Sequence, residues 1–120
     1  MTFETFVQEM LDRFPFLRTE CMGYMDEDEP LAYIALGCVF NPWLKKSLEA
    51  RDIANISQAC EFLEYVLVEG KNNDRIEDLV AIEIGEWLPE LREKKLLLSH
   101  LGPETRRVCC YHITRLPEES

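Results

Sequence analysis

Residues 52–70, DIANISQACEFLEYVLVEG, decide the fold of this chain. Apolar residues recur here at spacings of three and four, which gathers them on one face of an α-helix; they are Ile53, Ile56, Cys60, Leu63 and Leu67. Asp52 is a residue type that caps helix N-termini, and Gly70 is the type that most often follows a helix C-terminus. The stretch therefore predicts one amphipathic helix over residues 53–69.

Helical patterns continue on both sides of this stretch, with breaks at proline, glycine and charged runs. The expected helices are residues 3–14, 16–25, 31–40, 42–50, 53–69 and 75–88, one between Pro89 and Pro103, and a segment 104–116 that a strand would also accept. The apolar run 31–40 is compatible with a buried strand, but its helical neighbours favour a helix. Asn41-Pro42 predicts a break before the next helix. Asn73 or Asp74 is the expected cap of the helix that follows.

Length and composition are those of a small globular domain. The chain has 120 residues, of which 47% are hydrophobic, enough for a single core. We expect one all-α domain over residues 1–120, with about six to seven short helices packed as antiparallel hairpins. The arrangement would be compatible with HEAT-like repeats, although no sequence repeat is visible.

Cysteine usage and hydropathy bear on location. Five cysteines are an odd number, which is not typical of a secreted disulfide framework. The N-terminus has no signal-peptide pattern, and the longest uncharged stretch, residues 30–44, is shorter than the roughly 20 residues of a membrane span. We expect a cytoplasmic protein with reduced thiols.

The charge is strongly acidic. The chain has 13 Lys and Arg and 23 Asp and Glu, which gives a formal net charge of −10. The acidic excess lies within residues 1–90. Such a chain repels nucleic acids and anionic membranes, so the expected partner is a cationic protein. The candidate partner-binding residues are Asp26, Glu27, Asp28, Glu29, Glu61, Glu64, Tyr65, Asp74, Glu77, Asp78 and Glu83.

Four of these candidates have an alternative interpretation. Helical geometry places Glu61, Glu64 and Tyr65 opposite the apolar stripe, as an interface anchor or as an ordinary solvated face. Glu83 falls inside the apolar stripe of its helix. A carboxylate there is either paired with a neighbouring helix or placed at the floor of a partner-binding groove.

Catalytic patterns are missing from the sequence. Neither histidine has the glutamate three residues earlier that a helical di-iron site uses, and the glycines form no phosphate-binding loop. No nucleophile with a base and an oxyanion hole can be assembled from sequence spacing. We therefore expect no enzyme, no cofactor and no metal.

Two stretches carry a family resemblance: GCVFNPWL at residues 37–44 and LGPET at residues 101–105. With the small size, acidity and helical pattern, they make the chain similar to the immunity proteins that are encoded beside bacterial contact-dependent or polymorphic toxins. The resemblance implies an immunity protein that binds and neutralises a cognate toxin, commonly a basic nuclease. The alternative is a helical adaptor or regulatory domain without a toxin partner, whose acidity serves solubility.

Overall fold

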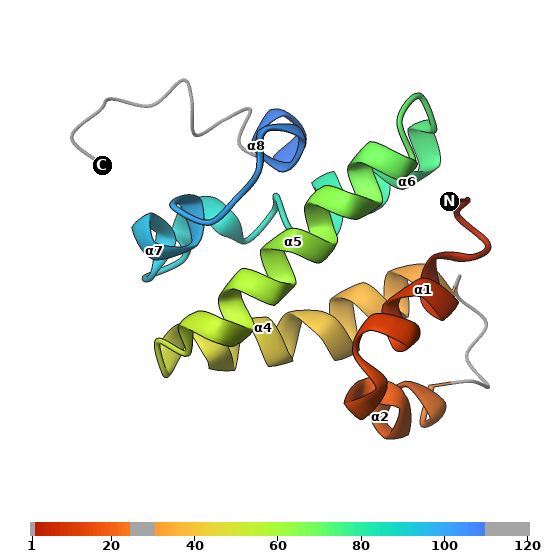
Figure 1. The fold of residues 1–120 in the computed structure, drawn as a ribbon, viewed down its shortest axis with the longest axis horizontal. Coiled ribbons are helices and arrows are strands. Elements are labelled where there is room, and N and C mark those ends of the chain that lie inside the picture. Colours follow the sequence, from red (N-terminus) through yellow and green to blue (C-terminus); the bar gives the residue numbers. More distant parts are fainter. Residues whose placement is uncertain (1, 25–30, 110–120) are drawn as a thin grey trace.

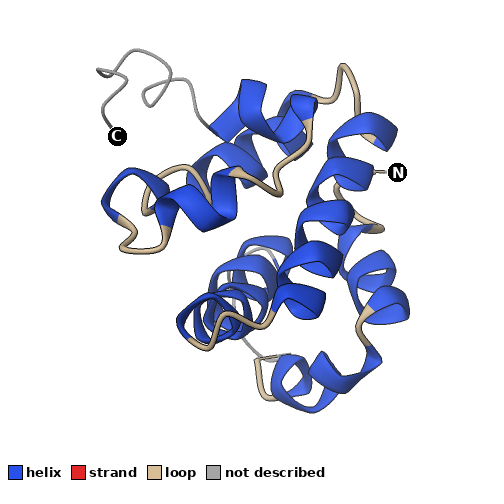
Figure 2. Ribbon diagram, turned by 60° about the vertical axis from the view of Figure 1, so that its left-hand side comes forward, coloured by secondary structure: helices blue, strands red, loops and turns tan. Residues whose placement is uncertain are grey.

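The computed structural model of the protein describes residues 2–24 and 31–109, and within these residues it is helical without strands (Figures 1 and 2). The α-helices are α1 (Phe6–Arg13), α2 (Arg18–Met22), α3 (Leu31–Ile34), α4 (Asn41–Glu49), α5 (Ile53–Glu69), α6 (Asp74–Glu83), α7 (Lys94–Leu98) and α8 (Pro103–Cys109). Two 3₁₀ turns, η1 (Pro15–Leu17) and η3 (Leu88–Glu90), and a π-helical segment, η2 (Ala35–Phe40), complete the described part. The all-α prediction is confirmed, whereas a HEAT-like repeat stays a prediction.

Helix α5 is the central element, as its sequence predicts. It contacts α1, α4, α6 and α8, and Figure 1 shows α4 and α5 meeting at a turn at the lower left and diverging from it. The carboxylate of Asp52 accepts the backbone N–H of Asn55 at 3.1 Å, so the predicted N-cap is confirmed. The predicted apolar stripe is buried except for Ile53, the first residue of α5, which is 50% exposed.

The segments α3, η2 and α4 follow one another without a break, although a break at Asn41-Pro42 is the sequence expectation. Asn41 has helical dihedrals of −60° and −45°, and its N–H bonds to the carbonyl of Leu36, five residues earlier. Proline has no N–H, and its ring would clash with the carbonyl four residues before it in a regular α-helix. The wider π-helical turn directly before Pro42 accommodates the ring, which is why the helix continues.

Aromatic rings form the centre of the hydrophobic core. Phe14 packs edge-on against Phe62 with ring centroids 5.4 Å apart, and Phe40 lies 6.0 Å from the same ring. Trp43 closes this cluster at 5.0 Å from Phe14. The rings come from the residue that follows α1 and from η2, α4 and α5, so the core joins elements that are distant in sequence.

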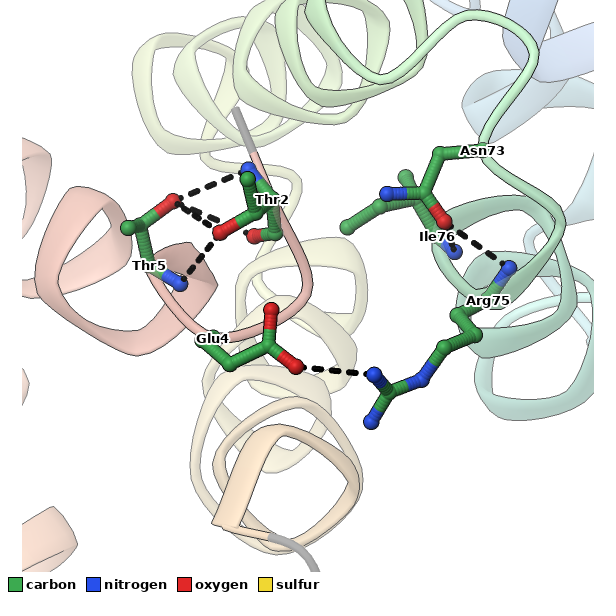
Figure 3. Close-up of polar contacts among 6 residues, drawn as sticks. All are labelled: Thr2, Glu4, Thr5, Asn73, Arg75 and Ile76. Carbon is green, nitrogen blue, oxygen red and sulfur yellow. Dashed lines mark hydrogen bonds and ion pairs between the residues drawn. The ribbon is translucent and has the colours of Figure 1, made fainter.

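The N-terminal turn is tied to the start of α6 (Figure 3). The carboxylate of Glu4 pairs with Arg75 at 2.8 Å, and the guanidinium of Arg75 lies 4.1 Å from the ring centroid of Phe3. The predicted cap Asn73 accepts the backbone N–H groups of Arg75 and Ile76. These contacts fix the position of the first turn of α6, which carries two of the candidate carboxylates.

The second half of the chain contains shorter helices than the sequence predicts. Helix α6 ends at Glu83 and not at residue 88, and only α7 is α-helical between Pro89 and Pro103. Leu88 and Leu97 are both fully buried. Nine residues apart on one helix, they would point to opposite sides, so the chain has to turn between them, with Leu91 in an extended conformation. Helix α8 resolves the first part of segment 104–116 as a helix, and residues 110–116 lie outside the described residues.

Within the described residues, no helix has the length and apolar character needed to cross a membrane. The thiols of Cys21 and Cys60 are buried, and that of Cys38 is exposed. Burial raises the pKa of Cys60 to about 12, which keeps this thiol protonated and unreactive.

Candidate functional site

The structure separates the predicted acidic site into exposed and internally bonded side chains. Glu61 on α5 and Asp74 and Asp78 on α6 are exposed. Across residues 2–24 and 31–109, none of these three carboxylates has an ion pair or a side-chain hydrogen bond. The run Asp26–Glu29 lies outside the described residues. We call Glu61, Asp74 and Asp78 the open acidic set.

Glu64 does not point into solvent from an outward helix face. Its carboxylate accepts the N–H of Glu104 at 3.1 Å, and the N–H and hydroxyl of Thr105 at 2.9 Å each. The carboxylate thus caps the N-terminus of α8, where unpaired N–H groups and the helix dipole favour an anion. Gly102 leaves the necessary space, because a Cβ atom there would lie 2.5 Å from the Glu64 carboxylate.

Glu77 also faces α8. Its carboxylate pairs at 2.9 Å with Arg107, which pairs in turn with Glu104 at 3.0 Å. The hydrogen bond to Glu77 raises the pKa of the Arg107 guanidinium. Glu64 from α5 and Glu77 from α6 therefore hold the two ends of the same short helix.

Tyr65 faces α1 and is not an isolated anchor on the surface. Its hydroxyl donates a hydrogen bond to Glu9 at 3.0 Å, and this bond raises the pKa of the phenol. The guanidinium of Arg13 lies 5.2 Å from the centre of the Tyr65 ring, within cation–π range. Tyr65 thus connects α5 to α1.

Glu83 is half-buried against η2. A Cβ atom at Gly37 would lie 2.4 Å from its carboxylate oxygen, so the glycine permits this approach. The main-chain carbonyl of Glu83 accepts hydrogen bonds from the Asn41 amide at 2.7 Å and from the Trp87 indole at 2.6 Å. This position places Glu83 beside η2, and the pairing of its carboxylate with a neighbouring helix stays a prediction. The stretch 37–44 thereby contacts the end of α6, as the stretch 101–105 contacts α5.

A cleft that the sequence does not predict lies between the C-terminal end of α4 and the chain around η3. Its volume is about 1000 Å³, and its lining residues are Lys45, Glu49, Arg51, Glu86, Trp87, Glu90, Leu91, Arg92 and Glu93. The ammonium of Lys45 lies 4.7 Å from the Trp87 ring centre, which links the two walls. The charges along it are mixed.

A second hollow of about 580 Å³ adjoins this cleft, since both are lined by Arg51, Leu91, Arg92 and Glu93. Lys94, Lys95 and Leu96 complete it, so four cations face one carboxylate there. We call this second hollow the basic groove. The sequence contains one signal for the basic groove, because the net charge is positive after residue 90. Sequence spacing does not show that Arg51 lies close to Arg92.

The described residues hold no cluster of three or more histidine, cysteine, aspartate and glutamate side chains that could bind a metal ion. The described residues thus form carboxylates that hold α8, the open acidic set on α5 and α6, a cleft of mixed charge, and the basic groove beside that cleft. Such surfaces can bind a protein by charge complementarity.

Comparison with known proteins gives a family without an assigned activity. No curated protein and no solved structure is significantly similar to the chain. A family model described as "Domain of unknown function (DUF7674)" matches residues 7–114, which include every described helix except the first residue of α1. The chain therefore belongs to the DUF7674 family.

Proposed function

We propose that this chain is a protein-binding module that recognises a cationic protein domain, and that it acts in the cytoplasm as an immunity protein against a basic, nuclease-type toxin. The observation that carries the proposal is the open acidic set. Its three carboxylates have no internal partner in the described residues of a chain with a net charge of −10. They can pair with lysine or arginine of a partner without first losing an internal bond.

The same argument changes the residues expected at the interface. Glu64 accepts three hydrogen bonds and Glu77 one ion pair, so using them in an interface would release α8. Glu61, Asp74 and Asp78 carry no such cost. A nuclease that holds phosphates needs a cationic site, and an acidic surface attracts that site at long range and competes with its substrate.

A growth assay tests the proposal. The chain is co-expressed with the protein encoded by each neighbouring gene, and growth and complex formation are measured. We expect one neighbour to be toxic alone and harmless together with the chain. The variant Glu61→Gln/Asp74→Asn/Asp78→Asn should lose protection, because it removes the charges that meet the partner.

The control is Asp12→Asn/Glu20→Lys, which raises the net charge by three, as the triple variant does, at exposed carboxylates of α1 and α2 that line neither hollow. It should protect as well as the original chain. If no neighbour is toxic, the immunity role is wrong and an adaptor role takes its place. If both variants lose protection equally, the total charge of the chain determines binding and the open acidic set is not the interface.

A further inference from the structure

We propose that the basic groove binds a short acidic segment of a partner protein, at a surface separate from the open acidic set. The groove is lined by Arg51 from the turn between α4 and α5, and by Arg92, Lys94 and Lys95 from the chain around the start of α7. Leu91 and Leu96 add apolar surface between these cations. The proposal does not rest on the function proposed above.

Three of the four cationic side chains make no ion pair and no side-chain hydrogen bond within the described residues. Lys94 donates a hydrogen bond to the carbonyl of Pro89 at 3.5 Å. Arg51, Arg92 and Lys95 make no ion pair and no side-chain hydrogen bond with any residue of the described part. In a chain with ten more acidic than basic residues, three adjacent cations without carboxylate partners are unexpected. Their charge is available to a ligand with carboxylates.

The backbone at Arg51 strengthens this argument. Arg51 follows the last turn of α4 with φ at +54°, a conformation that suits glycine and disfavours a side chain with a Cβ atom. The N–H of Asp52 bonds back to the carbonyl of Ser47, which closes the helix end without any contribution from the arginine side chain. Local structure therefore favours glycine at this position, and the guanidinium lies where both hollows meet.

The charges of the adjoining cleft indicate which kind of ligand fits the basic groove. Four glutamates line the larger cleft; they are Glu49, Glu86, Glu90 and Glu93. A nucleic-acid strand, with a phosphate at every nucleotide, would meet these carboxylates as it left the basic groove. A second copy of this chain would bring its own net charge of −10, so the two copies would repel each other. A protein segment with carboxylates at one end, and apolar or basic side chains at the other, matches both halves.

The size of the site agrees with a segment of chain. Small-molecule sites usually measure about 300–1000 Å³. The larger cleft alone reaches about 1000 Å³, and the basic groove extends it by about 580 Å³. The two hollows together leave room for several residues of an extended peptide.

Random peptides of twelve residues, displayed on phage and selected against the full chain, test the proposal. We expect the selected peptides to contain clustered Asp and Glu together with Leu. Their dissociation constants, measured by fluorescence anisotropy, should rise at least tenfold in the variant Arg51→Gly/Arg92→Gln. The indole N–H signal of Trp87, which lines the larger cleft, should shift when peptide is added.

Lys71→Gln is the matched control, because Lys71 is an exposed cation at the opposite end of α5 from Arg51. It should change the dissociation constants less than twofold. Selected peptides without clustered acids, or equal affinity of both variants, would overturn the proposal. Two further results would also overturn it: binding of the oligonucleotide dT12 that the double variant abolishes, and self-association in sedimentation that the double variant abolishes. The occupant would then be a nucleic acid or a second copy of the chain.

Discussion

Replacing Glu64 by alanine should destabilise the protein through the loss of α8. The carboxylate accepts three hydrogen bonds from Glu104 and Thr105, and Thr105 is fully buried. Hydrogen bonds to a charged group contribute about 1.5–3 kcal/mol each, and they are not additive for one carboxylate. Because the Thr105 hydroxyl would also lose its acceptor, we expect the free energy of unfolding to fall by about 2–4 kcal/mol.

Urea denaturation followed by circular dichroism at 222 nm measures this loss. In thermal denaturation followed by the same signal, the melting temperature should fall by about 10 °C, as expected for a loss of this size in a chain of this length. Glu64→Gln retains one acceptor oxygen and should lose about half as much. The control is Glu61→Ala, one turn earlier on α5, where the side chain is exposed. It should change stability by less than about 0.5 kcal/mol. Equal losses in Glu61→Ala and Glu64→Ala would refute the capping role.

Three further predictions concern neighbouring features. Gly102→Ala places a Cβ atom 2.5 Å from the Glu64 carboxylate, so it should lower the free energy of unfolding by about 1–3 kcal/mol, and by clearly less in a Glu64→Ala background; additive losses in a double-mutant cycle would contradict this. Arg51→Gly relieves the positive φ and should raise stability by about 1 kcal/mol in urea, so a decrease would show that the arginine serves the fold. Ellman's reagent at pH 8 should label Cys38 rapidly and Cys60 only after unfolding. Burial raises the pKa of Cys60 from 9.0 to about 12, so its stabilising contribution is complete below pH 9 and is lost as the pH rises toward 12. Stability should therefore fall less between pH 8 and pH 10.5 in Cys60→Ala than in the original chain; an equal fall would exclude this contribution.

Local patterns predicted the central part of the fold. The stretch 52–70 predicted α5 together with its Asp52 cap, because cap, apolar spacing and terminal glycine all lie within 19 consecutive residues. Phe3, Phe6, Met10 and Phe14 recur at spacings of three and four along the chain, and all four are buried. The limits of the helices were predictable only where no distant contact overrides the local signal. Pro42 and Leu91 are the two exceptions, since the helix continues through Pro42 after a π-helical turn and the chain is extended at Leu91.

The candidate site was less predictable, because contacts between distant residues determine it. Helix geometry predicted that Glu64 and Tyr65 lie opposite the apolar stripe of α5, but both side chains are only partly exposed and are bonded to neighbouring helices. It could not show that α8 and α1 pack there, since the partners lie 40 and 56 residues away in sequence. The basic groove likewise needs the turn at Arg51 to meet residues 91–96. Charge counts found the acidic excess, but not which carboxylates remain available to a partner.

The open acidic set is tested most directly by the association rate with the protein encoded beside this chain. Stopped-flow mixing at 50 mM and 300 mM salt should give a rate constant that falls at least about tenfold, because long-range attraction is screened. In Glu61→Gln/Asp74→Asn/Asp78→Asn the rate at low salt should be lower and should fall less steeply as salt is added. An association rate that does not change with salt, or one that the triple variant leaves unaltered, would contradict recognition of a cationic partner by these carboxylates.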